Sequence, residues 1–165
     1  MSDVSIRPFA WRDVPEITAI YRHYVDETVI TFETEAPSEA AMADRFGKMV
    51  DLGHPILVAE RAGKVIGYAY ASFYRPRFAY RFTCENSIYL DKDELGQGLG
   101  GRMLEALLEG CREHGFKQMI AVITAERANS IRVHEKLGFR KVGHYEAVGY
   151  KFDRWLDIVH MQKAI

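Results

Sequence analysis

Apolar residues near the start of the chain recur at the spacing of one helix face. A short strand is predicted at residues 4–8. A helix is predicted to begin at Asp13, because Glu16 three residues later completes a capping box and Pro15 suits the first turn. Its apolar stripe falls at three- and four-residue intervals and consists of Ile17, Ile20, Tyr21 and Tyr24. The pattern therefore predicts a strand followed by an amphipathic helix.

The next segments change from helical to alternating character. Residues 28–37 are polar and irregular and are predicted to form a loop, after which Ser38 is expected to cap a second helix that reaches about residue 52. Apolar runs at 55–60 and 65–73 flank Ala62-Gly63-Lys64, which predicts a β-hairpin.

The remaining segments alternate between strands and helices. A helix after residue 98 carries its apolar face on Leu99, Met103, Leu104, Leu107, Leu108 and Cys111. The other predicted elements are strands at 83–90, 118–124, 139–151 and 155–163 and a short helix at 129–137. This order is typical of an α+β protein, and the strand–helix–strand unit at 83–124 predicts one right-handed parallel crossover.

Composition narrows the class of protein. A chain of 165 residues, 48% hydrophobic and 27% charged, is expected to be a single globular domain spanning 1–165. Its net charge of −1 provides no overall field for nucleic acid or a membrane surface. Without a predicted signal peptide or an apolar run of membrane-spanning length, a cytoplasmic location is expected.

Cysteine and histidine usage predicts neither a disulfide framework nor a metal site. Cys84 and Cys111 both lie in apolar segments, where small buried hydrophobes are expected. The histidines show no pair at metal-ligand spacing, so no metal is expected.

The glycine-rich segment between a strand and a helix is the most informative feature of the sequence. It consists of Gly96, Gln97, Gly98, Leu99, Gly100 and Gly101. Glycines let the main chain approach a ligand closely, and the start of the following helix offers free N–H groups and a positive dipole end. The segment therefore predicts a phosphate or diphosphate site.

Two common phosphate-binding folds do not fit. The glycines satisfy G-x-G-x-x-G, and Glu126 follows the next strand, as in a dinucleotide site. However, the motif lies too late in a short chain, and the segments before it predict antiparallel strands. A Walker loop is excluded because no Lys-Ser/Thr follows the last glycine.

The chain resembles the GNAT superfamily of acetyl-CoA-dependent N-acetyltransferases, and within it the phosphinothricin and methionine sulfone (sulfoximine) acetyltransferases. The resemblance rests on three blocks between about residues 6 and 162. The first block is Leu95 to Gly100, in which Leu95 departs from the usual polar residue, and the second is Asn129 to Phe139. The third block combines Arg77-x-x-Tyr80-x-x-Thr83-x-Glu85-x-Ser87-Ile88-Tyr89 with the later segment Val148 to Asp157. The resemblance implies a mixed, mostly antiparallel sheet of about six to seven strands with helices on both faces.

The resemblance also implies where acetyl-CoA binds. The glycine loop, Gly96 to Gly101, would hold the diphosphate through its main-chain amides. The main chain of Ile88, Tyr89 and Leu90 would pair with the pantetheine arm like an added strand, with Asn129 and Ser130 beside it.

Two side chains are the candidate catalytic groups. By position alone Glu85 could be an ordinary surface or ion-paired glutamate, but its match to the subgroup makes it the candidate base, acting directly or through water. His134 occupies the place of the superfamily tyrosine that protonates the CoA thiolate, and its alternative is a histidine that only packs.

The acceptor is expected to be a small amino acid or analogue. Arg75 and Arg77 are candidates to grip its carboxylate, with more weight on Arg77 because the subgroup match is clearer there. The other residues expected at the acceptor pocket are Phe32, Pro76, Tyr80, Thr83, Asn86 and Ser87.

The aromatic cluster of Tyr150, Phe152 and Trp155 is expected either to pack in the core or to form the interface of a homodimer, which is usual in the subgroup.

From the resemblance we predict transfer of acetyl from acetyl-CoA to the α-amine of an acceptor such as methionine sulfone, methionine sulfoximine or phosphinothricin. Acetylation of a protein N-terminus or a polyamine, and a non-catalytic CoA-binding regulatory module, are the alternatives.

Overall fold

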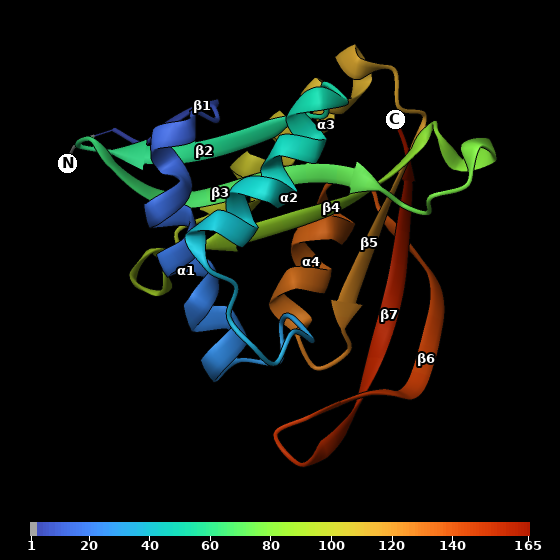
Figure 1. The fold of residues 1–165 in the computed structure, drawn as a ribbon. Helices are drawn as coiled ribbons and strands as arrows, with labels where there is room; N and C mark the ends of the chain where they lie inside the picture. The colour runs from blue at the N-terminus through green and yellow to red at the C-terminus, as the bar shows by residue number, and fades with distance from the viewer. Residues whose placement is uncertain (1–2) are drawn as a thin grey trace.

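The computed structural model describes residues 3–165 as one mixed sheet with helices on both faces (Figure 1). The seven strands lie in the order β1-β2-β3-β4-β5-β7-β6; β4 and β5 run parallel, and the other neighbouring pairs are antiparallel. The strands are β1 (Ser5–Pro8), β2 (Ile56–Arg61), β3 (Lys64–Phe73), β4 (Thr83–Leu90), β5 (Gln118–Thr124), β6 (Arg140–Lys151) and β7 (Arg154–Ala164). The predicted α+β class and its parallel crossover are confirmed.

The helices form two layers that enclose two hydrophobic clusters. They are α1 (Val14–Glu27), α2 (Glu39–Asp51), α3 (Leu99–His114) and α4 (Ala128–Lys136), with short 3-10 turns η1 (Trp11–Asp13), η2 (Phe78–Tyr80) and η3 (Lys92–Glu94). The α1/α2 layer packs on β2 and β3 around Phe46 and Tyr68, whereas α3 packs on the opposite face around Met103 and Met119. Burial of these apolar side chains is the main stabilising contribution to the sheet and helix layers.

The α1/α2 layer does not extend across the whole sheet. On that side, alternate residues of β5, β7 and β6 remain accessible, and Val122 and Tyr145 are 36% and 50% exposed. Figure 1 shows β6 and β7 extending away from the helices as a long hairpin. The half of the sheet that α1 and α2 cover therefore adjoins a half whose surface is partly accessible to solvent.

The start of α1 differs from the predicted capping box. Asp13 does not cap the helix with its side chain; its carboxylate is buried and accepts two hydrogen bonds of 2.8 Å from the Arg7 guanidinium. Glu16 instead accepts a 2.7 Å hydrogen bond from the Val65 amide. Both acids connect α1 to the sheet, because tertiary partners offered stronger contacts than the local cap. The predicted cap of the next helix is confirmed, since Ser38 accepts a hydrogen bond from the Ala41 amide.

Two further expectations concern the cysteines and the membrane. Cys84 and Cys111 are fully buried and unbonded, with their Sγ atoms 3.9 Å apart, so they act as small hydrophobes. Within residues 3–165, every helix is too short or too polar to cross a bilayer.

The candidate site lies where β4 and β5 separate. Their parallel pairing covers Thr83–Glu85 against Gln118–Ile120, and β4 then continues to Leu90 without β5 as its neighbour. Figure 1 shows the two strands diverging. The split leaves an opening in the middle of the sheet, beside the second half of β4.

Candidate active site

The main chain of β4 presents polar groups to this opening. Asp91 donates its amide to Ile66 of β3, and Thr83 accepts from Tyr74, so the odd-numbered residues of β4 direct their peptide groups to β3. By alternation, the even-numbered residues direct theirs to the opposite edge. Beyond Glu85 that edge is no longer paired with β5, which leaves the N–H and C=O of Ile88 facing the opening.

The neighbours of Ile88 do not offer the same groups. The Tyr24 hydroxyl caps the main chain of Leu90, donating to its carbonyl at 2.6 Å and accepting from its amide at 3.4 Å. Tyr89 directs its peptide groups to β3, and its ring packs against Tyr21 and Tyr24. Of the three residues that the sequence analysis assigned to this role, the opening therefore meets the free main chain of Ile88.

The glycine loop has the conformation that its composition suggests. Gly96 and Gly98 have φ of +78° and +76°, a left-handed region in which a side chain is strained. A Cβ atom placed at Gly96, Gly98 or Gly101 meets no atom of residues 3–165 within 4 Å, so the described part of the chain leaves the space beside the loop free. The first amides of α3 have no partner within their own helix, and together these features suit an anionic diphosphate.

Other residues of the loop divide between core and surface. The Leu99 side chain is buried in the core and anchors the start of α3, so this residue can offer a ligand only its main chain. Gln97 and Leu95 are exposed. At the start of α4, Asn129 is hydrogen-bonded to Arg132, and the Ser130 carbonyl is occupied by His134.

Glu85 lies on the α1/α2 side of β4, at the point where pairing with β5 ends. It shares this face with Ser87, and its register partners are Ser72 of β3 and Ile120 of β5. Burial raises the pKa of the Glu85 carboxyl, and the positive charge of Arg75 opposes that rise. A carboxylate with a raised pKa at the mouth of an opening is suited to accept a proton.

The two arginines before β4 have different environments. The Arg75 guanidinium lies 5.1 Å from the centre of the Tyr74 ring, and its charge acts on both Glu85 and His160. Arg77 begins the η2 turn and is exposed, and its side chain makes no hydrogen bond or ion pair with residues 3–165. Both arginines are exposed, and it is the positive charge of Arg75 that acts on Glu85, whereas the sequence analysis gave more weight to Arg77. Pro76 between them is also exposed.

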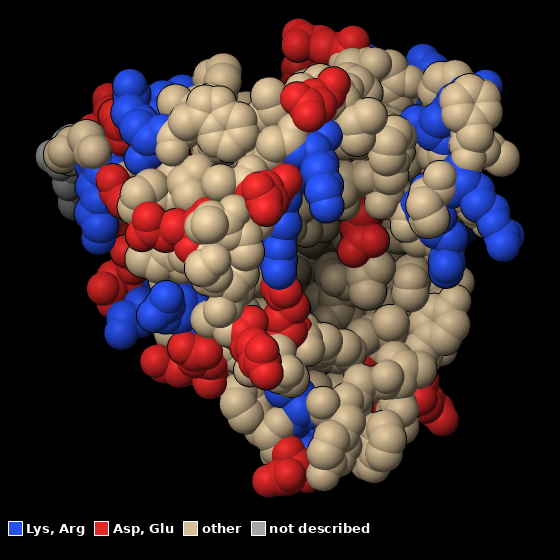
Figure 2. Space-filling view, viewed as in Figure 1, with Lys and Arg blue, Asp and Glu red and all other residues tan. Residues whose placement is uncertain are grey.

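A cavity of about 320 Å³ lies between the η2 segment and the accessible face of β5 and β7, and its lining includes Thr83 of β4 and Ile120, the register partner of Glu85 in β5. The side chains that line it are largely polar, and they include Tyr74, Tyr80, Thr83, Tyr145, His160 and Gln162. Figure 2 shows a hollow between the helical layer and the β6–β7 hairpin, with acidic and basic groups near its rim. Sequence reasoning found Tyr80 and Thr83 but missed the residues that β6 and β7 bring from the end of the chain.

His134 and Asn86 meet on the other face of β4. His134 is buried, with Nδ1 2.8 Å from the Ser130 carbonyl oxygen and Nε2 3.2 Å from the Asn86 side-chain amide. Burial lowers the pKa of His134, although the Ser130 carbonyl opposes this effect. The ring is therefore neutral near pH 7, donating from Nδ1 and accepting at Nε2.

The position of Asn86 corrects its expected role. The sequence analysis placed it in the acceptor pocket with Glu85, but adjacent residues of a strand point to opposite faces, and its side chain lies against α4. In this orientation its amide nitrogen is buried without a hydrogen-bond partner among residues 3–165; exchanging the two amide ends lets this nitrogen donate to His134 Nε2.

The loop that contains Phe32 is held in place by the β6–β7 hairpin. Lys151 is buried and donates a 2.8 Å hydrogen bond to the Thr31 carbonyl. The Phe32 ring packs so closely on Gly149 that a Cβ there would collide with it. Glu33 pairs with Arg45 at 2.9 Å. Phe32 thus belongs to an anchored loop beside the same face as Glu85.

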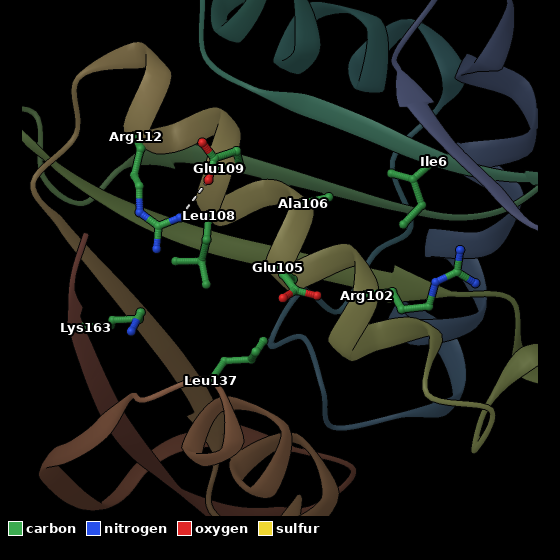
Figure 3. A pocket seen from close by; sticks show the side chains of 9 residues that line it. All are labelled: Ile6, Arg102, Glu105, Ala106, Leu108, Glu109, Arg112, Leu137 and Lys163. Carbon is green, nitrogen blue, oxygen red and sulfur yellow. Dashed lines mark hydrogen bonds and ion pairs between the residues drawn. The ribbon is translucent and has the colours of Figure 1, made fainter.

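A second, larger cavity of about 550 Å³ lies along α3 (Figure 3). Its walls carry opposite charges that partly neutralise one another, as in the 2.9 Å pair of Arg112 and Glu109. None of the side chains predicted to form the site line it. The chemistry is concentrated at the β4–β5 opening instead.

The comparisons with known proteins agree with this geometry. Residues 17–139 match the model of the Acetyltransferase (GNAT) family. The chain is 44% identical over 154 residues to phosphinothricin N-acetyltransferase of Alcaligenes faecalis, covering 93% of this chain and 78% of that protein. It is 41% identical over 160 residues to L-methionine sulfoximine/L-methionine sulfone acetyltransferase of Pseudomonas aeruginosa, covering 96% and 92%.

Solved structures share the whole fold. A phosphinothricin acetyltransferase from Sinorhizobium meliloti, crystallised in complex with acetyl-CoA, superimposes with a TM-score of 0.96 at 44% identity, covering 100% of this chain and 89% of that one. An acetyltransferase from Salmonella typhimurium with acetyl-CoA gives a TM-score of 0.97 at 35% identity, covering 99% and 94%.

The environment of His134 predicts its titration. Because its pKa is lowered in the folded protein, protonation favours the unfolded chain, and this contribution to stability is lost as pH falls below the ordinary value of about 6.5. NMR titration of the His134 ring should show it neutral through that range. A His134 that becomes charged at or above pH 6.5 would contradict the proposed network.

Proposed function

The chain belongs to the acetyltransferase (GNAT) family, and we propose that its acceptor is the α-amine of a small amino acid or analogue. As an acetyl-CoA-dependent N-acetyltransferase it needs a diphosphate site, an edge for the pantetheine arm and a base. The observation that carries the proposed acceptor is the partly buried Glu85 carboxyl at the β4–β5 opening, on the same face as a polar cavity and under the influence of the positive charge of Arg75.

Binding of acetyl-CoA is assigned to main-chain groups. The amides of the glycine loop and the start of α3 receive the diphosphate, and the peptide groups of Ile88 pair with the amide-rich arm. The Ile88 amide also provides a donor for the oxygen of the thioester carbonyl as negative charge develops there.

Glu85 and Arg75 act on different groups of the acceptor. Arg75 holds the α-carboxylate, while Glu85 removes a proton from the ammonium group, directly or through water. The freed amine attacks the acetyl carbon, forming the C–N bond as the C–S bond to CoA breaks. The nitrogen then loses its second proton, which the departing thiolate accepts, so that CoA leaves as the thiol while Glu85 returns its own proton to solvent. Direct attack is supported because Cys84 is buried on the opposite face of β4, where contact with Cys111 and burial raise its thiol pKa.

His134 acts through Asn86 in this proposal. A neutral ring that donates from Nδ1 and accepts at Nε2 directs no proton into the opening, which supports positioning of β4 over direct protonation of the thiolate. A polyamine acceptor is disfavoured because the Arg75 cation would repel it. The unbonded thiols support the expected reducing, cytoplasmic compartment.

Replacing the base tests the proposal directly. Glu85→Gln should lower kcat by about 10²- to 10⁴-fold, the usual contribution of a general base, and leave the acetyl-CoA Kd unchanged. Thiol release with methionine sulfone as the acceptor measures kcat, and calorimetry measures the acetyl-CoA Kd. Glu146→Gln, in exposed β6, is the control. Unchanged turnover in Glu85→Gln would reject this base, and acetyl-CoA binding without turnover in the wild type would favour a regulatory module.

The two arginines form a matched pair of variants. Arg75→Met should raise the KM for methionine sulfone by about 10- to 100-fold, as expected for a charged hydrogen-bonding partner, with little change in kcat. Arg77→Met should leave KM nearly unchanged, because the charge that acts on Glu85 is that of Arg75. The reverse result would restore the greater weight that the sequence analysis gave to Arg77.

We propose further that the exposed aromatic patch of Tyr150, Phe152 and Trp155 is the interface of a homodimer. These side chains are 52–66% exposed, so core packing, the other reading of the cluster, does not apply. Exposed aromatic groups of this size favour protein interfaces. Trp155→Lys should convert a dimer to a monomer in sedimentation, whereas Trp11→Lys, at a tryptophan that is also more than half exposed, should not. A wild-type monomer would overturn this assignment.

A further inference from the structure

His160 is a polar residue of the cavity to which neither the sequence nor the proposed chemistry gives a role. It lies in β7, opposite Val122 of β5 and Gly143 of β6. Alternation places its ring on the side of the sheet that α1 and α2 leave uncovered, where it lines the cavity with Tyr145 and Gln162. The Tyr145 ring meets it edge-on, with the ring centres 4.8 Å apart.

The two ring nitrogens of His160 have unequal surroundings. Nδ1 is buried and has no hydrogen-bond partner within residues 3–165. Nε2 is the ring nitrogen that remains accessible, and no described side chain or main-chain group bonds to it. A polar atom that faces a cavity and is unused by the fold is available to a ligand.

The charge and tautomer of the ring follow from these surroundings. Burial lowers the pKa of His160, and the nearby positive charge of Arg75 lowers it further, so the ring is neutral near pH 7. A neutral imidazole carries one N–H. Because a buried N–H without an acceptor is rarer and more costly than an unused lone pair, the hydrogen resides on Nε2. The cavity therefore receives a hydrogen-bond donor.

The position of His160 indicates which part of the acceptor it meets. In the proposed function, on which this inference rests, Glu85 takes the amine and Arg75 the α-carboxylate. The cavity runs from Thr83 of β4 over Ile120 of β5 to β7, which lies two strand spacings, or roughly 10 Å, from β4, so it is the space we assign to the third substituent of the α-carbon. At that distance the cavity presents the His160 ring.

We propose that His160 is a specificity-determining residue whose Nε2–H donates a hydrogen bond to an oxygen on the acceptor's side chain. The class of acceptor is an amino acid whose side chain carries an oxo or oxyanion oxygen three or four bonds from the α-carbon. A side chain without such an oxygen leaves this donor unpaired in a partly desolvated cavity, and the loss discriminates against it.

The decisive measurement compares two acceptors that differ in the side-chain oxygens. His160→Leu should lower kcat/KM for methionine sulfone by about tenfold, the equivalent of one hydrogen bond, and leave kcat/KM for methionine nearly unchanged. His160→Gln should restore most of the loss, because its amide nitrogen reaches the place of Nε2. His160→Asn, whose nitrogen corresponds to Nδ1, should not.

Two controls distinguish a role of His160 in acceptor specificity from a purely structural role. Thermal unfolding should be similar in the three variants, and NMR of the wild-type ring should show the Nε2–H tautomer and a shift of that nitrogen on addition of methionine sulfone. An equal fall for both acceptors, no fall for either, or an Nδ1–H tautomer would overturn the role of His160. Wild-type protein inactive on every amino acid, with intact acetyl-CoA binding, would overturn the proposed acceptor and this inference with it.

Discussion

The separation of β4 from β5 after Glu85 is the constraint on which the site depends. A strand in the middle of a sheet normally has both edges satisfied, and unpaired peptide groups inside a protein are costly. Here the fold satisfies part of the free edge itself, because the Tyr24 hydroxyl caps both main-chain groups of Leu90. The groups of Ile88 are left for an extended, amide-bearing ligand, and the glycine loop that follows β4 faces free space at the end of the same path.

The two faces of β4 carry separate tasks because strand side chains alternate. Glu85 and Thr83 lie on the face with the acceptor cavity, where burial and the charge of Arg75 set the proton affinity of the carboxylate. Asn86 lies on the other face and meets a neutral, buried His134. One strand thus presents the proposed base on one face and contacts His134 on the other, while the main chain of Ile88 is left for the proposed pairing with acetyl-CoA.

The acceptor side is assembled from segments far apart in the sequence. The η2 region supplies Arg75, and β7, at the end of the chain, supplies His160. The loop around Phe32 is held by Lys151 and Gly149 of β6. Since helices cover β2 and β3 but leave β5 and β7 accessible, this end of the sheet can line a pocket, and variation in β6 and β7 can alter the acceptor without disturbing the coenzyme path.

The sequence by itself determined the order of elements and the glycine loop, because these depend on local periodicity and on backbone conformations that few residues adopt. Only the tertiary structure decided which partners the polar groups found. Asp13 and Glu16 bond to Arg7 and Val65 across the fold instead of capping α1. Strand order and register decide that His160 lines the cavity and that the charge of Arg75 acts on Glu85, because they bring together residues that local sequence patterns cannot relate.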